Sequence, residues 1–165
     1  MTKRADKPDP DNLEEAERQE VYQSIGRFIF HFSQLEFTIR TVLAAELRIS
    51  GAHFAMVMSV FDFAASCRVA IAAFRQSHRF DEARKKQLVK LLNRALELND
   101  HRVRVAHGVW AVSPTGAGAR HVSRQNLVAK DYYEKRGELR ELADAAQDVM
   151  GCILELMMGR PASKP

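Results

Sequence analysis

Apolar residues recur at helical spacing in four segments of this chain, which predicts four α-helices. The first covers about 12–49 and the second about 52–76, where nearly the whole circumference is apolar, as in a central or interface helix. The third begins near Asp81, and the fourth runs from Asp131 to Gly159. The apolar stripes are Val21, Ile25, Phe28, Phe32, Leu35, Ile39 and Val42; Val57, Val60, Ala64, Cys67, Ile71 and Phe74; Leu88, Leu91, Ala95 and Leu98; and Leu139, Leu142, Ala146, Val149, Ile153 and Leu156.

A change of pattern separates the third and fourth helical segments. Residues 113–118 have the composition of a turn and lie between two β-capable stretches, 109–112 and 120–123. Asp131 followed by Glu134 matches a capping box at the start of the last helix. We therefore predict an all-α fold, an antiparallel four-helix bundle with a short β-hairpin or loop insertion before the last helix.

Length and composition indicate one domain. A chain of 165 residues, of which 46% are hydrophobic, can bury one core but is short for two. We expect a disordered N-terminal tail over residues 1–11, a single helical domain over 12–159 and a C-terminal tail over 160–165.

The sequence lacks the patterns of several protein classes. No segment approaches 18 uninterrupted apolar residues, and the N-terminus is polar, so we expect no membrane association. Cys67 and Cys152 lie in apolar helical patterns without a closely spaced partner, as in reduced cytoplasmic proteins. No zinc-ligand spacing, glycine-rich phosphate loop or dinucleotide fingerprint occurs, so we expect no metal and no cofactor.

A polar cluster at residues 98–110 interrupts the predicted buried side of the third helix. One apolar stripe continues from Leu98 to Arg102, and a second ends at His107. Five helical residues correspond to about 140° of rotation, so the two side chains lie on different edges of a straight helix. A joint site would need a bend, another helix or a second chain. Gly108 predicts the end of this helix through a left-handed conformation.

Two interpretations of this cluster follow from the residues alone. In the structural one, Arg102 forms a buried ion pair with Glu36, which interrupts the apolar stripe of the first helix, and His107 binds a helix-terminal carbonyl. In the chemical one, imidazole transfers protons near neutral pH and arginine binds phosphate oxygens. The net charge of +4 is compatible with RNA. So is the basic face of the third helix, although a run of this kind is most often a solvated surface: Arg84, Lys85, Lys86, Lys90 and Arg94.

At these residues the chain resembles the HEPN domains, small helical proteins that are often metal-independent ribonucleases. The resemblance covers about residues 20–158 and rests on Arg102-x4-His107, on Ala106-His107-Gly108, and on Phe32-Ser33-Gln34-Leu35-Glu36 in an earlier helix. Val103 stands where the HEPN motif usually has a polar residue.

The resemblance implies a homodimer in which motifs of two protomers meet in one cleft and cleave RNA to a 2′,3′-cyclic phosphate. Arg102 would bind phosphate and His107 would act as acid or base, supported by Asn99, His101, Arg104 and Glu36. It also implies a toxin, phage-defence or stress module with a regulatory partner protein. The alternative is a catalytically silent dimeric helical module that binds a partner protein or a nucleotide.

Overall fold

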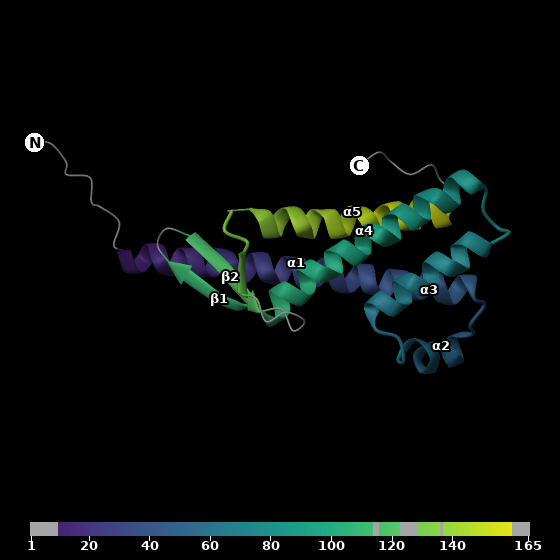
Figure 1. Cartoon of the computed structure of the whole chain (residues 1–165), viewed down its shortest axis with the longest axis horizontal. Helices are drawn as coiled ribbons and strands as arrows, with labels where there is room; N and C mark the ends of the chain where they lie inside the picture. The colour runs from purple at the N-terminus through teal and green to yellow at the C-terminus, as the bar shows by residue number, and fades with distance from the viewer. Residues whose placement is uncertain (1–9, 114–115, 123–128, 136, 160–165) are drawn as a thin grey trace, which may run out of the picture.

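The chain is mainly helical, as predicted, with a small antiparallel sheet (Figure 1). The computed structural model describes residues 10–113, 116–122, 129–135 and 137–159. Within these ranges the elements are α1 (Pro10–Glu46), α2 (Gly51–Met58), α3 (Phe63–Gln76), α4 (Glu82–His107), β1 (Val109–Ser113), β2 (Gly116–Val122), β3 (Ala129–Tyr132) and α5 (Glu138–Met157). The predicted tails lie outside these ranges, except that Pro10 and Asp11 already belong to α1.

One core joins the four longer helices. α1 packs against α5, α3 and α4, and α4 also packs against α3 and α5. Figure 1 shows α4 crossing in front of α1, with α3 beside α1 and α5 along the opposite side. Many of the largest fully buried side chains come from the predicted stripes, including Phe28, Leu35, Ile39, Phe74, Leu88, Leu98 and Ile153, whereas Leu43, Met58 and Leu92 are buried outside them. Among the helices of the described ranges, none combines the length and apolar character that crossing a membrane requires.

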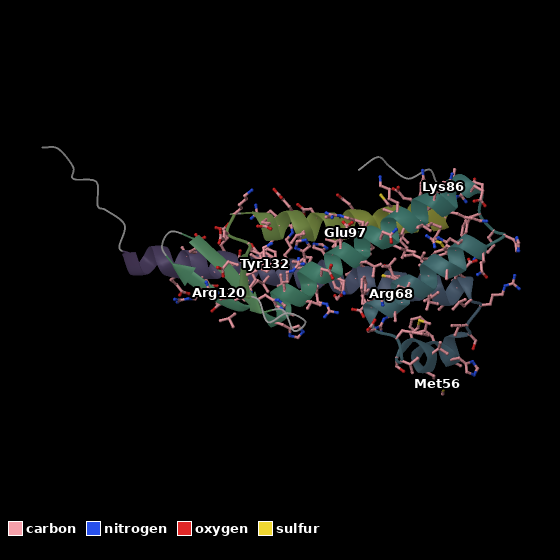
Figure 2. The ribbon with its side chains drawn as sticks, in the orientation of Figure 1. Met56, Arg68, Lys86, Glu97, Arg120 and Tyr132 are labelled. Carbon is pink, nitrogen blue, oxygen red and sulfur yellow. The ribbon has the colours of Figure 1, made fainter. Side chains whose placement is uncertain are left out.

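The second predicted helix is two helices, α2 and α3. The connection between α2 and α3 ends at Asp62, which is the N-cap of α3. Its carboxylate accepts a hydrogen bond from the backbone N–H of Ala65 at 2.6 Å. α3 carries several buried residues, whereas α2 buries Met58 and lies at the edge of the molecule with Met56 71% exposed (Figure 2). Apolar character around the whole circumference therefore did not indicate a central position for α2.

The predicted hairpin is present and is extended by a third strand. β2 pairs antiparallel with both β1 and β3, and Trp110, Ala119 and Tyr132 lie opposite one another in adjacent strands. Asp131 is part of β3, where its carboxylate accepts two hydrogen bonds from Arg120 at 2.8 and 3.0 Å. The predicted start of the last helix at Asp131, with a capping box, is therefore wrong. α5 begins at Glu138, after Gly137 with φ of 88°.

α4 ends at His107, as predicted, but Gly108 is not left-handed. Its φ of −74° and ψ of 150° are extended backbone. Glycine is needed here for close approach instead, because a Cβ atom would lie 2.6 Å from the Arg104 carbonyl oxygen and 3.3 Å from Cβ of Ala119. This contact lets β2 lie directly against the last turn of α4.

Candidate functional site

Arg102 projects from α4 toward α1 and is half-buried. Its guanidinium carbon lies 5.4 Å from the centroid of the Phe32 ring, which packs at 4.7 Å against the ring of Phe63, the first residue of α3. A cation over an aromatic face is attracted by the ring quadrupole. In the part of the chain that the structure describes, Arg102 has no ion pair. The site thus presents an arginine that is held against Phe32 and that no carboxylate of the described residues neutralises.

The predicted ion pair between Arg102 and Glu36 is not formed. Glu36 pairs instead with Arg40, one turn further along α1, at 2.7 Å. Arg40 also donates to the backbone carbonyl of Phe61 at 3.1 Å, in the connection between α2 and α3. Residues four apart on one helix are neighbours, so this local pair forms without any requirement on how α1 and α4 cross. Glu36 therefore fastens the α2–α3 connection to α1 and does not serve Arg102.

Buried polar groups lie in the helices around this pair. Among the described residues, Asn99 Oδ1, Arg40 Nε and Ser66 Oγ are buried without a hydrogen-bond partner. The Cys67 thiol is also enclosed here, and burial, followed by the charge of Glu36, raises its pKa to about 12. A buried polar atom without a partner costs free energy, so these three atoms, on α1, α3 and α4, are polar exceptions within an apolar core. Asn99, predicted to support the site, is one of them.

His107 is exposed at the last residue of α4. Because α4 is continuous from Glu82 to His107, the rotation of about 140° between Arg102 and His107 is retained. Arg102 turns toward the core and His107 turns to solvent. A single chain therefore does not bring the two side chains into one site.

His101 and Arg104 contact the sheet and not Arg102. The Tyr133 hydroxyl donates to the His101 carbonyl at 3.2 Å and lies 3.2 Å from Nδ1 of the same residue. The Arg104 guanidinium lies 4.8 Å from the centroid of the Tyr132 ring (Figure 2 labels Tyr132). Burial, and next the charge of Arg104, lowers the pKa of His101 below its ordinary value. These two residues fix β3 to α4.

Trp110 completes this aromatic cluster. Its ring stacks on Tyr133 at 5.7 Å, and its Nε1 donates to the carbonyl of Val105 at 3.1 Å. Trp110 lies in the predicted β-capable stretch 109–112, but Tyr132 and Tyr133 were assigned to the predicted last helix and were missed. Two adjacent tyrosines after a β-capable stretch were the available signal.

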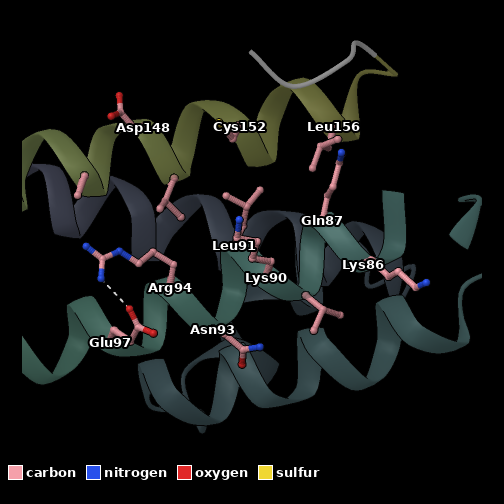
Figure 3. A pocket seen from close by; sticks show the side chains of 13 residues that line it. Lys86, Gln87, Lys90, Leu91, Asn93, Arg94, Glu97, Asp148, Cys152 and Leu156 are labelled. Atoms are coloured by element: carbon pink, nitrogen blue, oxygen red, sulfur yellow. Dashed lines mark hydrogen bonds and ion pairs between the residues drawn. The ribbon is translucent and has the colours of Figure 1, made fainter. Parts of the chain in front are cut away.

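A groove of about 770 Å³ lies between α4 and α5 (Figure 3). Leu91, Val149 and Leu156 are among its apolar lining residues. Lys86, Lys90 and Arg94 line it from α4, and Arg94 pairs with Glu97 at 2.6 Å. The predicted basic face of α4 therefore borders an apolar groove. This groove uses the N-terminal half of α4, away from Arg102 and His107.

The protein is mainly helical, and its small sheet packs against the last turns of α4. The same turns of α4 carry Arg102, which has no carboxylate partner among the described residues. No family model matches this chain, and no curated protein or solved structure is significantly similar to it. Within the described ranges, no group of three or more His, Cys, Asp or Glu side chains is arranged to hold a metal ion.

Proposed function

We propose that this protein is an HEPN-like, metal-independent RNA endonuclease that acts as a homodimer. Its scaffold would be an antiparallel four-helix bundle of α1, α3, α4 and α5. The observation that carries the proposal is the state of Arg102, which is held against Phe32 and pairs with no carboxylate of the described residues. The positive charge and the N–H donors of such a guanidinium are available to bind two phosphate oxygens at once.

The chemistry asks for proton transfer and charge stabilisation. The 2′-oxygen of RNA attacks the adjacent phosphorus, the bond from phosphorus to the 5′-oxygen breaks, and a 2′,3′-cyclic phosphate and a 5′-hydroxyl result. A neutral His107 imidazole accepts the proton of the 2′-hydroxyl, and a protonated imidazole donates one to the leaving 5′-oxygen. Arg102 stabilises the extra negative charge on the phosphate oxygens in the transition state.

A second protomer supplies what the single chain lacks. Arg102 and His107 lie on different edges of α4, so the Arg102 of one protomer would act with the His107 of the other. The dimer also provides two imidazoles, one for each proton transfer. From the family resemblance, the setting would be a cytoplasmic toxin, phage-defence or stress module restrained by a partner protein.

A specific observation also favours a second function, a catalytically silent dimeric module that binds a partner protein or nucleotide. The groove between α4 and α5 combines an apolar floor with Lys86, Lys90 and Arg94, and it lies apart from Arg102 and His107. Val103, in the place of the polar residue of the HEPN motif, agrees with this alternative. In that case Arg102 would only hold α4 against α1.

Cleavage of mixed-sequence single-stranded RNA in EDTA separates these functions. We expect wild-type protein to leave 2′,3′-cyclic phosphate ends. Arg102→Ala and His107→Ala should each lower the rate by a factor of about 10²–10⁴, because a phosphate clamp or a general acid is lost. His78→Ala, which changes another exposed histidine, is the matched control, and circular dichroism verifies the fold of each variant.

An inactive wild type, or activity that survives in folded Arg102→Ala and His107→Ala, would contradict the nuclease proposal. The search for function would then turn to the groove between α4 and α5.

A further inference from the structure

Two cations lie against one aromatic ring at the edge of the sheet. The Arg104 guanidinium carbon lies 4.8 Å from the centre of the Tyr132 ring, and the Lys130 ammonium lies 5.4 Å from the same centre. Tyr132 stands where the sheet meets α4 (Figure 2). A cation–π contact holds a positive charge in place but does not cancel it. The ring of Tyr132 therefore keeps two like charges close together.

No carboxylate among the described residues neutralises this pair of cations. Arg104 and Lys130 form no ion pair within the described ranges. Asp131, next to Lys130 in β3, is bound through both carboxylate oxygens to Arg120 across the sheet. Asp100, one turn before Arg104 on α4, is exposed and contacts neither cation. Like charges repel, so a bound polyanion would lower the free energy of this arrangement.

Two histidines extend the cationic pair at its two ends. His107 lies one turn after Arg104 on α4, so the two side chains are neighbours on the helix surface. His121 lies opposite Lys130 in the adjacent strand, and side chains at opposite positions share one face of a sheet. Both imidazoles can donate hydrogen bonds to phosphate oxygens. We call Arg104, His107, His121, Lys130 and Tyr132 the α4–β3 surface.

The α4–β3 surface continues from His107 on the side away from Arg102. Around the axis of α4, His107 is rotated by about 140° from Arg102, and Arg104 by about 200° in the same sense. His107 therefore lies between the two arginines around the helix. A strand bound at His107, where the Arg102 of the other protomer would act, can pass over Arg104 to Lys130 and does not cross the Arg102 edge of its own chain.

We propose that the α4–β3 surface binds the phosphate backbone of single-stranded RNA beside the bond that is cleaved. Arg104 binds one phosphate through its fork of N–H groups, and Lys130 binds a neighbouring phosphate as a point charge. The inference rests on the proposed nuclease function, because that function supplies RNA as the anion. It adds two substrate-binding residues to Arg102 and His107. Phosphate contacts fix the position of a strand without selecting its sequence.

The arrangement of the charges favours a single strand over an acidic protein or a free nucleotide. The cations follow one another from α4 to β3, which suits a chain of phosphates better than one phosphate group. Protein interfaces usually have an apolar or aromatic centre. The aromatic ring of this surface, Tyr132, is contacted by both cations and is not available as such a centre.

Binding of an RNA that cannot be cleaved tests this surface separately from catalysis. A single-stranded oligonucleotide with every 2′-hydroxyl methylated has no nucleophile, so fluorescence anisotropy in EDTA measures its affinity alone. Lys130→Gln and Arg104→Gln should each weaken binding by a factor of about 3–10. Each should also reduce the slope of log affinity against log salt by about 0.7, as expected when one phosphate contact on a single strand is lost. Arg104→Lys keeps the charge and should keep the slope.

Arg75→Gln is the matched control. Arg75 is an exposed cation in the last turn of α3, next to the start of α4, whereas the sheet contacts the end of α4. This variant should bind the RNA as the wild type does. Asp100→Asn should instead tighten binding by a factor of about 2–5, because it removes the exposed carboxylate one turn from Arg104. Circular dichroism establishes that each variant is folded.

The α4–β3 surface would be overturned by a wild type that does not bind the methylated RNA, or by folded Lys130→Gln and Arg104→Gln that bind with wild-type affinity and slope. An equal loss in Arg75→Gln would also overturn it, because net charge alone would then explain binding. A mononucleotide or an acidic peptide that binds as tightly as the RNA would overturn the choice of partner.

Failure of the nuclease function gives a different result. RNA that is bound through Lys130 and Arg104 but never cleaved would overturn that function and leave the surface in place. In an active enzyme, Lys130→Gln should raise KM and leave kcat nearly unchanged, whereas His107→Ala should lower kcat. Cleavage with unchanged KM in folded Lys130→Gln would support the nuclease function and overturn the surface.

Discussion

Arg102 lies with its guanidinium carbon 5.4 Å from the centre of the Phe32 ring, so α4 crosses α1 at a contact between a cation and an aromatic face. Glu36, one turn along α1 from Phe32, is paired with Arg40 instead. Arg102 therefore contributes to the packing of the two helices without being neutralised by a carboxylate of the described residues. This relationship makes its contribution to stability measurable separately from its chemistry.

Arg102→Met should lower the free energy of unfolding by about 1 kcal/mol or less, because the methionine keeps the contact with Phe32 and only a half-exposed cation–π interaction is lost. Urea unfolding measures this difference. Arg40→Met should cost more, about 1–3 kcal/mol, because it leaves Glu36 without its partner and the Phe61 carbonyl without its donor. A loss above about 3 kcal/mol for Arg102→Met would instead indicate a broken buried ion pair.

Acid should destabilise the protein through His101. Its pKa in the folded state is below the ordinary value near 6.5, because burial and Arg104 disfavour the charged ring. As the pH falls below about 6.5, the unfolded chain therefore binds a proton that the folded chain resists, and the free energy of unfolding decreases. His101→Phe should reduce the slope of unfolding free energy against pH between 6.5 and the lower folded pKa.

An equal slope in wild type and His101→Phe would show that another group causes the acid sensitivity.

Alanine at Gly108 should destabilise the fold by about 1–3 kcal/mol, because its Cβ atom would lie 2.6 Å from the Arg104 carbonyl oxygen at the end of α4 and 3.3 Å from Cβ of Ala119 in β2, so the backbone must shift. The matched control is Gly151→Ala, which meets nothing within 4 Å and should stabilise α5 by about 0.5–1 kcal/mol. Thermal or urea unfolding of both variants gives the comparison. Similar effects of the two substitutions would contradict this prediction. They would show that the structure accommodates a Cβ atom at Gly108 without loss of stability.

The two cysteines should react with a thiol reagent at very different rates. Cys67 is fully buried and its pKa is raised to about 12, so almost no thiolate forms at pH 8. Cys152 is only partly buried, at the groove between α4 and α5. Native protein should therefore label at one thiol, and the second should react only on unfolding. Cys152→Ser should remove the fast reaction, and two equivalent fast thiols would contradict the structure.

Much of the helical content, and much of the buried side of each long helix, could be predicted from residue spacing. The stripe through Leu88, Ala95 and Leu98 is buried, and α4 ends at His107. The rotation between Arg102 and His107 also followed from spacing, because a continuous helix has a constant turn per residue. Asp131 was assigned to a helix start because Glu134 follows it three residues later, as in a capping box. The same residues can also stand in a strand, and only the pairing of Asp131 with Arg120 across the sheet shows that they do.

The sequence by itself determined most of the buried stripes of α1, α4 and α5, where α4 ends, and that Arg102 and His107 cannot share one edge of a helix. Periodicity is a local property of the backbone, so it can be read without knowing the neighbours of a helix. Only the tertiary structure decided that Glu36 binds Arg40, that Arg102 lies on Phe32, and that Arg104 and His101 contact Tyr132 of β3 and the next residue, Tyr133. These partners depend on how the helices cross and where the sheet docks, which follow from the packing of the whole core.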